Sequence, residues 1–168
     1  LHVMDREGDD YALFAHLVGG NHRFLIRLMH DRILKKQLGL ATIRIRDALA
    51  EVECSVECTA KLSKREDTGR SRLQRSTHPA RAARLAKLAI GALRVELPRP
   101  AERAASLPER LSLNVVRVWE LDPPEGPIPV NWVLLTSEAV ANPQPLLHLL
   151  PVLRARSTIA ELSTAPPP

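Results

Sequence analysis

The spacing of apolar residues predicts a strand, a helix and a second strand at the start of the chain. Residues 1–4 form a short apolar run that ends at Asp5. Apolar residues then recur at helical spacing over 11–18, and Asp9 is the predicted helix cap. Residues 22–28 alternate as a strand does. A strand, a helix and a strand joined by short loops are typical of an α/β unit, and we expect residues 1–4 to form an inner strand of its sheet.

The pattern changes after residue 30. A short helical pattern lies in 43–52, and four extended segments follow, separated by turns. The predicted strands of this region are 56–62, 93–97, 111–121 and 130–135. From residue 143 the apolar spacing is helical again, although Pro151 interrupts it. We therefore expect an α/β piece over 1–35, a β-rich subdomain over 36–138 and a helical segment over 139–168.

Charge is concentrated in one part of the chain. The segment 61–87 contains nine basic and two acidic residues, a net charge of +7, whereas the whole chain of 168 residues carries +5. The remainder is therefore at −2. A basic segment of this kind indicates a polyanionic partner such as DNA, or else a solvated loop.

Composition excludes several classes of function. The two cysteines, Cys54 and Cys58, are too few for a structural zinc site and are best interpreted as small buried apolar residues. Gly19 and Gly20 end a helix and do not form a phosphate-binding loop. The longest apolar stretch, around 146–153, is far shorter than the ~18 residues that span a bilayer, so we expect no membrane contact and a cytoplasmic protein.

Asp5 is the first candidate for chemistry, because a carboxylate at the end of a strand is held in place by the sheet behind it and can bind a metal ion. The alternative is an ordinary turn or cap residue. From the residues alone, Arg27 could equally be a solvated strand residue and Trp132 a core residue.

Four sequence blocks occur in order between residues 5 and 140. They are DREGDDYALFAHL, NHRFLIRLMHDR, HPARAARLAKLAIGALRVELPRP and WELDPPEGPIPVNWVLLTSEAV. Together they resemble the bacterial insertion-sequence transposases of the cut-and-paste DDE (Asp-Asp-Glu) class. In that family a β-strand insertion domain interrupts an RNase H-like core. The resemblance implies an α/β fold, here a partial RNase H-like core with an inserted β-rich subdomain and a C-terminal helical stub.

The resemblance also implies a role for individual residues. Asp5 matches the second of three catalytic carboxylates and would bind Mg²⁺ or Mn²⁺, which stabilise the attacking and leaving oxygens of phosphodiester cleavage. Arg6, Arg27 and His30 match positions that contact transposon-end DNA, although Met29 stands where a lysine is often found. Trp132 matches a tryptophan on which a flipped base stacks.

The C-terminal segment departs from the family pattern Tyr-x2-Arg-x3-Glu-x6-Lys. Arg156 matches the arginine and completes the predicted DNA-binding set, but Ala160 takes the place of the catalytic glutamate. Glu161 follows one residue later, about 100° further around a helix. In the family the first catalytic Asp lies on a strand upstream of the position that Asp5 matches, and we expect this fragment to lack that strand.

We therefore expect a truncated transposase fragment that is inactive alone, from an enzyme that acts as a homodimer on transposon-end DNA. The alternatives are a basic DNA-binding module without catalysis and a poorly folded remnant.

Overall fold

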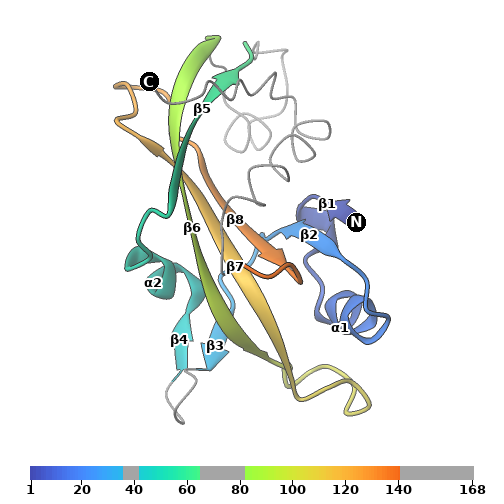
Figure 1. The fold of residues 1–168 in the computed structure, drawn as a ribbon. Coiled ribbons are helices and arrows are strands. Elements are labelled where there is room, and N and C mark those ends of the chain that lie inside the picture. The colour runs from blue at the N-terminus through green and yellow to red at the C-terminus, as the bar shows by residue number, and fades with distance from the viewer. Residues whose placement is uncertain (36–41, 65–81, 141–168) are drawn as a thin grey trace.

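A single mixed β-sheet organises the protein. The computed structural model describes residues 1–35, 42–64 and 82–140. In this part of the chain, eight strands form one sheet with the order β1-β2-β8-β7-β6-β3-β4, and β5 pairs with β6 (Figure 1). The elements are β1 (His2–Met4), η1 (Arg6–Gly8), α1 (Tyr11–Gly19), β2 (Phe24–Arg27), β3 (Ile33–Lys35), β4 (Thr42–Arg44), α2 (Ile45–Ala50), β5 (Val56–Leu62), β6 (Arg84–Pro98), β7 (Arg110–Leu121) and β8 (Asn131–Thr136).

The long hairpin of β6 and β7 is the centre of the sheet. Twelve residue pairs join the two strands, from Lys87↔Leu121 to Pro98↔Arg110. β5 pairs antiparallel with the first half of β6. β3 pairs antiparallel with β6 near its C-terminal end, where Lys35 is opposite Glu96. β8 pairs with the other edge of β7. Buried apolar residues of β7 lie on both faces of the sheet: Leu111, Leu113 and Val115 pack on one face, and Val116 and Val118 pack on the other.

The N-terminal elements join this sheet through β8. β1 and β2 are parallel, and α1 forms the crossover between them. β2 then pairs antiparallel with β8, with Leu25 opposite Thr136. β1 is therefore at one end of the strand order and not inside the sheet, so the prediction of an inner strand was wrong.

Side chains on the two faces of the sheet form two separate cores. On one face, which we call the helix-covered face, Ile26, Val115 and Leu135 pack with α1 and α2. On the opposite face, the core includes Leu25 and Leu134. Neighbouring residues of a strand point to opposite sides, so the register assigns each strand residue to one of these faces.

The predicted α/β class was wrong. The described chain is mostly strand, and its two α-helices contain only nine and six residues. A mixed eight-stranded sheet takes the place of the expected RNase H-like core with a helical stub. The reason is that the opening strand-helix-strand unit is a minor part of the sheet, whereas the long antiparallel pairings of β6 and β7 form most of it. Of the predicted helical segment 139–168, residues 141–168 lie outside the described part.

Several individual elements were predicted correctly. The strand predicted at 56–62 is β5, and the strands predicted at 111–121 and 130–135 differ from β7 and β8 by one residue. The helical patterns correspond to α1 and α2. The strand predicted at 93–97 is the end of the much longer β6, and β3 and β4 were not predicted.

Gly91 allows the chain between α2 and β5 to cross β6 closely. A Cβ atom at this position would lie 2.4 Å from the carbonyl oxygen of Glu53 and 2.4 Å from Cγ1 of Val52. Close by, the backbone N–H of Ser55 donates to the carbonyl of Ile90. Only a residue without a side chain fits this approach of two backbones.

The loop that joins β6 to β7 is fastened to α1. The hydroxyl of the buried Tyr11 donates a hydrogen bond of 2.8 Å to the carbonyl of Pro108. Burial raises the pKa of Tyr11, and the nearby Arg99 opposes this shift. Arg103 of the same loop pairs with Asp10, the residue before α1. The hairpin and the N-terminal unit are therefore connected at two places besides the sheet.

Candidate functional site

Three of the predicted site residues lie together on neighbouring strands. Asp5 directly follows β1, Arg27 ends β2 and Trp132 is the second residue of β8. The Arg27 guanidinium carbon lies 5.8 Å from the centre of the Trp132 ring, and its Nη1 lies 3.7 Å from Oδ1 of Asp5. We call this group the Asp5–Arg27–Trp132 cluster.

The register of the strands explains why Arg27 meets Trp132. Arg27 pairs with Leu134, so the two side chains are on the same face of the sheet. Trp132 is two residues before Leu134 in β8 and points to that face as well. This is the face opposite to the helices, where Trp132 packs against the second core. The cluster is therefore fixed by the pairing of β2 with β8.

The cluster combines an aromatic surface with a cation. Trp132 is half-buried, which holds the indole in one place while part of it stays accessible. The Arg27 side chain is 17% exposed, whereas Asp5 is 48% exposed, so the ion pair between them adds at most about 1 kcal/mol of stability. A held indole next to a guanidinium is suited to stacking a nucleobase and binding its phosphate.

The other predicted DNA contacts are not part of this cluster. Arg6 begins η1, and its buried Nε has no hydrogen-bond partner within the described chain. His30 is exposed, and its backbone N–H donates to Asp9 at 2.8 Å. His30 also lines a cavity on the helix-covered face, together with Met29. Arg156 lies outside the described residues.

The described residues do not fit the two-metal site that the resemblance implies. The carboxylate of Asp5 faces the guanidinium of Arg27. No group of three histidine, cysteine, aspartate or glutamate side chains in residues 1–35, 42–64 and 82–140 is placed to hold a metal ion. Ala160 and Glu161 lie beyond these ranges. Asp5 alone cannot position two ions for cleavage.

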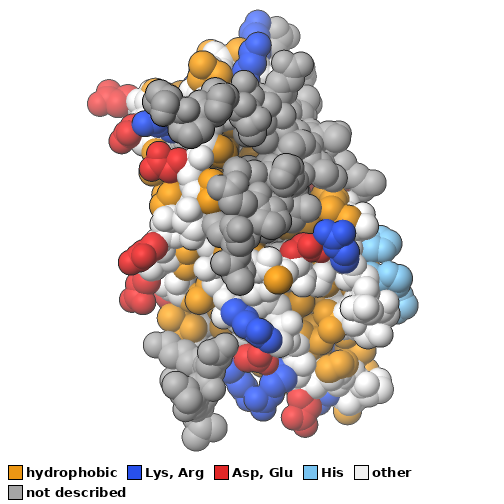
Figure 2. Space-filling model, viewed as in Figure 1, with side chains coloured by type: hydrophobic (Ala, Val, Ile, Leu, Met, Phe, Trp, Pro, Cys, Tyr) orange, Lys and Arg blue, Asp and Glu red, His pale blue; other side chains and the backbone are white. Residues whose placement is uncertain are grey.

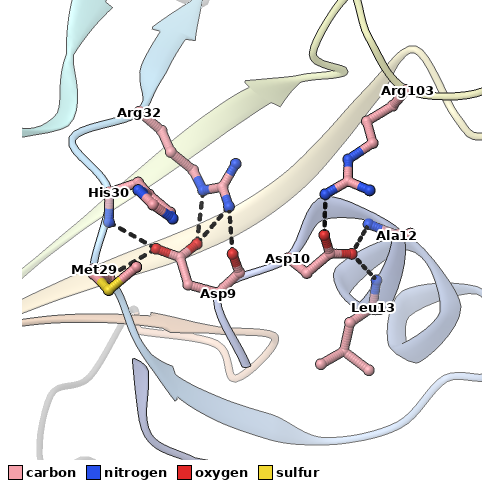
Figure 3. A network of polar contacts seen from close by, with 8 residues as sticks. All are labelled: Asp9, Asp10, Ala12, Leu13, Met29, His30, Arg32 and Arg103. Carbon is pink, nitrogen blue, oxygen red and sulfur yellow. Dashed lines mark hydrogen bonds and ion pairs between the residues drawn. The ribbon is translucent and has the colours of Figure 1, made fainter. Parts of the chain in front are cut away.

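The adjacent residues Asp9 and Asp10 have different roles (Figure 3). The prediction that Asp9 caps the helix was wrong. Asp10, not Asp9, caps α1, because its Oδ1 accepts hydrogen bonds from the backbone N–H groups of Ala12 and Leu13. The fully buried carboxylate of Asp9 instead binds Arg32, with Nε 2.8 Å from Oδ1. It also accepts hydrogen bonds from the backbone of Met29 and His30. Asp9 thus fixes the segment 29–32 between β2 and β3.

Only the ends of the basic segment 61–87 are described, because residues 65–81 lie outside the described ranges. Arg84 forms an ion pair with the buried Glu120, which raises the pKa of Arg84 through its hydrogen bonds. Glu120 also accepts a 3.0 Å hydrogen bond from the backbone of Val130. Arg84 therefore has a structural role, whereas Lys61 and Lys87 are exposed on β5 and β6.

Histidine side chains gather beside the N-terminal elements (Figure 2). The ring of His22 lies 5.3 Å from that of His2 and 6.4 Å from that of His16, measured between ring centres. All three are exposed. The spacing of these three histidines in the sequence did not indicate that they lie together. The parallel pairing of β1 and β2 brings the start of β1 next to the residues that precede β2.

No model of a known protein family matches this chain. In the part of the chain that the structure describes, no helix has both the length and the apolar character that crossing a membrane requires.

Proposed function

We propose that this chain is part of a cut-and-paste DNA transposase and that its described residues bind transposon-end DNA at an unpaired base. The observation that carries the proposal is the Asp5–Arg27–Trp132 cluster. The resemblance assigns these residues to separate sequence blocks, and they lie within contact distance of one another on β1, β2 and β8. Residues that bind one base and its adjacent phosphate must lie close together in this way.

Each side chain of the cluster has a distinct task in this proposal. A flipped base stacks on the indole of Trp132, which the second core holds in position. Arg27, adjacent to the ring, binds the phosphate next to that base. Asp5 orients the guanidinium of Arg27 through their ion pair. In the family, Mg²⁺ or Mn²⁺ supplies the stabilisation of charged oxygens during cleavage. Since the described residues do not fit that site, the proposal for them is binding without cleavage.

A basic DNA-binding module without base recognition is the second candidate. The net charge of +7 in 61–87 and the exposed Lys61 and Lys87 favour it. Such a module binds any duplex through its phosphates, and its affinity falls steeply with salt. The two candidates differ in whether an unpaired base and Trp132 matter.

Binding to a labelled DNA hairpin with one unpaired base, compared with a fully paired duplex of equal length, tests the proposal. Fluorescence anisotropy at several salt concentrations gives both affinities. Trp132→Leu keeps an apolar side chain for the core but removes the stacking surface. We expect it to weaken hairpin binding by about 1–3 kcal/mol, roughly 5- to 150-fold, and to leave duplex binding unchanged.

A charge-matched pair of variants separates the role of Arg27 from general electrostatics. Arg27→Gln should weaken hairpin binding, whereas Arg94→Gln, at an exposed arginine bonded to Ser112, should not. If Trp132→Leu and Arg27→Gln reduce hairpin and duplex binding equally, base recognition is wrong and the basic module is favoured.

A further inference from the structure

A cavity of about 400 Å³ lies on the helix-covered face, between the segment after β2, α2 and the strands β7 and β8. We call its buried lining residues, Leu28, Ile45 and Leu49, the apolar floor, and the exposed polar residues His30, Arg46 and Asn131 its rim. The apolar lining residues are Leu28, Met29, Ile45, Leu49, Ala50 and Val133, and the polar ones are His30, Asp31, Arg46, Arg117 and Asn131. A volume of this size, lined by apolar and polar side chains together, is in the range of small-ligand sites.

This cavity is separate from the Asp5–Arg27–Trp132 cluster. Arg117 pairs with Val133 across β7 and β8, so their side chains share a face. Val133 packs with the first core, whereas its neighbour Trp132 packs with the second. The sheet itself therefore stands between the cavity and the cluster, and a ligand in one cannot touch the other.

Arg117 is held in a fixed orientation at the cavity. Its Nη1 donates a 3.0 Å hydrogen bond to the carbonyl of Leu49 in α2. Its guanidinium carbon lies 4.9 Å from the centre of the Trp119 ring, two residues along the same strand. Stacking and hydrogen bonding together reduce the freedom that a long side chain would lose on binding a ligand.

The charges around the cavity favour an anion. Arg117 and Arg46 both line it, and Arg46 is exposed. The one acidic lining residue, Asp31, is bound by the protein itself. Its Oδ1 accepts a 3.0 Å hydrogen bond from the backbone of Arg46, and its Oδ2 lies 4.0 Å from Nη1 of Arg44. Two arginines, whose guanidinium groups are suited to binding an oxyanion, therefore line the same cavity as the apolar floor.

We propose that this cavity binds one nucleoside 5′-monophosphate unit. The phosphate binds Arg46 and Arg117, and the base covers the apolar floor between Leu49 and Val133. His30 and the side-chain NH2 of Asn131, whose Oδ1 accepts a 3.4 Å hydrogen bond from Nε of Arg117, offer hydrogen bonds to the edge of the base or to the sugar. The unit is either a free nucleotide or the 5′-phosphorylated end of a DNA strand. Only the second source rests on the proposed function.

Tryptophan fluorescence tests the proposal directly. The chain has two tryptophans, so Trp132→Phe leaves Trp119, beside Arg117, as the single reporter. We expect a saturable signal on titration with dAMP. Arg117→Gln and Arg46→Gln should each raise the Kd about tenfold or more, while Arg94→Gln should leave it unchanged. Because the side chain of Arg46 is exposed, its variant keeps the test valid if Arg117→Gln unfolds the protein.

The ligands separate the possible sources. A trinucleotide with a 5′-phosphate that binds more tightly than dAMP, and more tightly than the same trinucleotide without the phosphate, identifies a DNA end. Equal binding of dAMP and the phosphorylated trinucleotide identifies a free nucleotide. Inorganic phosphate that binds as tightly as dAMP would overturn the proposal, as would an unchanged Kd in Arg46→Gln or the absence of any saturable signal. None of these results would contradict DNA hairpin binding at Trp132, because the Asp5–Arg27–Trp132 cluster lies on the opposite face of the sheet.

Discussion

The substitution Asp9→Asn gives the sharpest test of how the segment after β2 is held. Asparagine has the shape of aspartate but no charge, and one of its two terminal atoms donates instead of accepting. The Asp9 carboxylate is fully buried and is surrounded by donors, namely the backbone of Met29 and His30 and the guanidinium of Arg32. In the variant, an N–H group must face at least one of these donors.

The expected loss of stability follows from these contacts. A hydrogen bond to a charged group contributes about 1.5–3 kcal/mol, and at least two such bonds to Asp9 are weakened or lost. Removing one partner of a buried ion pair costs about 3–5 kcal/mol, because the other charge stays buried. Arg32 is only 14% exposed and lies over the Phe14 ring, so water cannot easily replace Asp9. We expect the free energy of unfolding to fall by about 3–5 kcal/mol.

The adjacent residue provides a matched control. Asp10→Asn makes the same chemical change one position later, but asparagine caps a helix about as well as aspartate does. The pair that Asp10 forms with Arg103 is partly exposed on both sides and contributes about 1 kcal/mol or less. Urea unfolding followed by circular dichroism measures both variants. With m near 2 kcal/mol/M, Asp9→Asn should lower the midpoint by about 2 M and Asp10→Asn by less than 0.5 M.

Two results would refute this reasoning. If the two variants differ by less than about 1 kcal/mol, the Asp9 carboxylate is not the buried anchor described above. If Asp9→Asn combined with Arg32→Gln loses the full sum of the single losses, the two residues do not interact, since directly bonded partners are not additive.

Three further predictions concern other parts of the structure. Gly91→Ala should lower the free energy of unfolding by about 1–3 kcal/mol, because the new Cβ collides with the chain that crosses β6. Gly19→Ala is the control: its Cβ meets nothing within 4 Å, so it should be neutral or stabilising in the same urea assay. The hydrogen bond from Arg23 lowers the pKa of Glu138, so this carboxylate stabilises the fold above its unfolded pKa of about 4.3 and the stabilisation is lost as pH falls through the lower folded value. Thermal unfolding of Glu138→Gln should therefore depend less on pH than the wild type below about pH 5, and equal slopes would contradict the assignment. Tyr11→Phe keeps the buried ring but loses the hydrogen bond to the hairpin loop. Calorimetry should show that the free energy of unfolding falls by about 1 kcal/mol, much less than the several kcal/mol that truncation of a buried ring costs.

The strands that could be predicted from the sequence are those whose pattern is local. Val56–Leu62 and Arg110–Leu121 show the spacing of buried residues that strand geometry requires, so pattern alone located β5 and β7. β3 and β4 contain three residues each, too few for any period to be visible. Residues 84–92 of β6 contain Gly91 and three alanines, which favour strands weakly, and this segment is extended because β5 and β7 pair with both of its edges.

The fold class was missed because it depends on which strands pair, and the sequence pattern does not contain that information. Leu25 and Thr136 are partners although more than a hundred residues separate them. The candidate site shows the same limit. Asp9 and Asp10 are both suitable caps, and only the packing around Arg32 decides between them.

Part of the cavity could have been anticipated. Arg117 and Trp119 are two residues apart in a segment predicted as a strand, and side chains at that spacing lie on the same face of a sheet. What the sequence could not indicate is that α2 covers that face and that the backbone of Leu49 anchors the arginine.

The position of β8 between β2 and β7 has a consequence for biosynthesis. A ribosome delivers residues 1–27 early, yet their only strand partner in the main sheet, β8, emerges after every other strand of the described chain. Until then Leu25 and the unpaired edge of β2 remain open to solvent and to other nascent chains. Pairing over such a long sequence separation is slow, so completion of the sheet in the described residues is governed by β8 and not by β1.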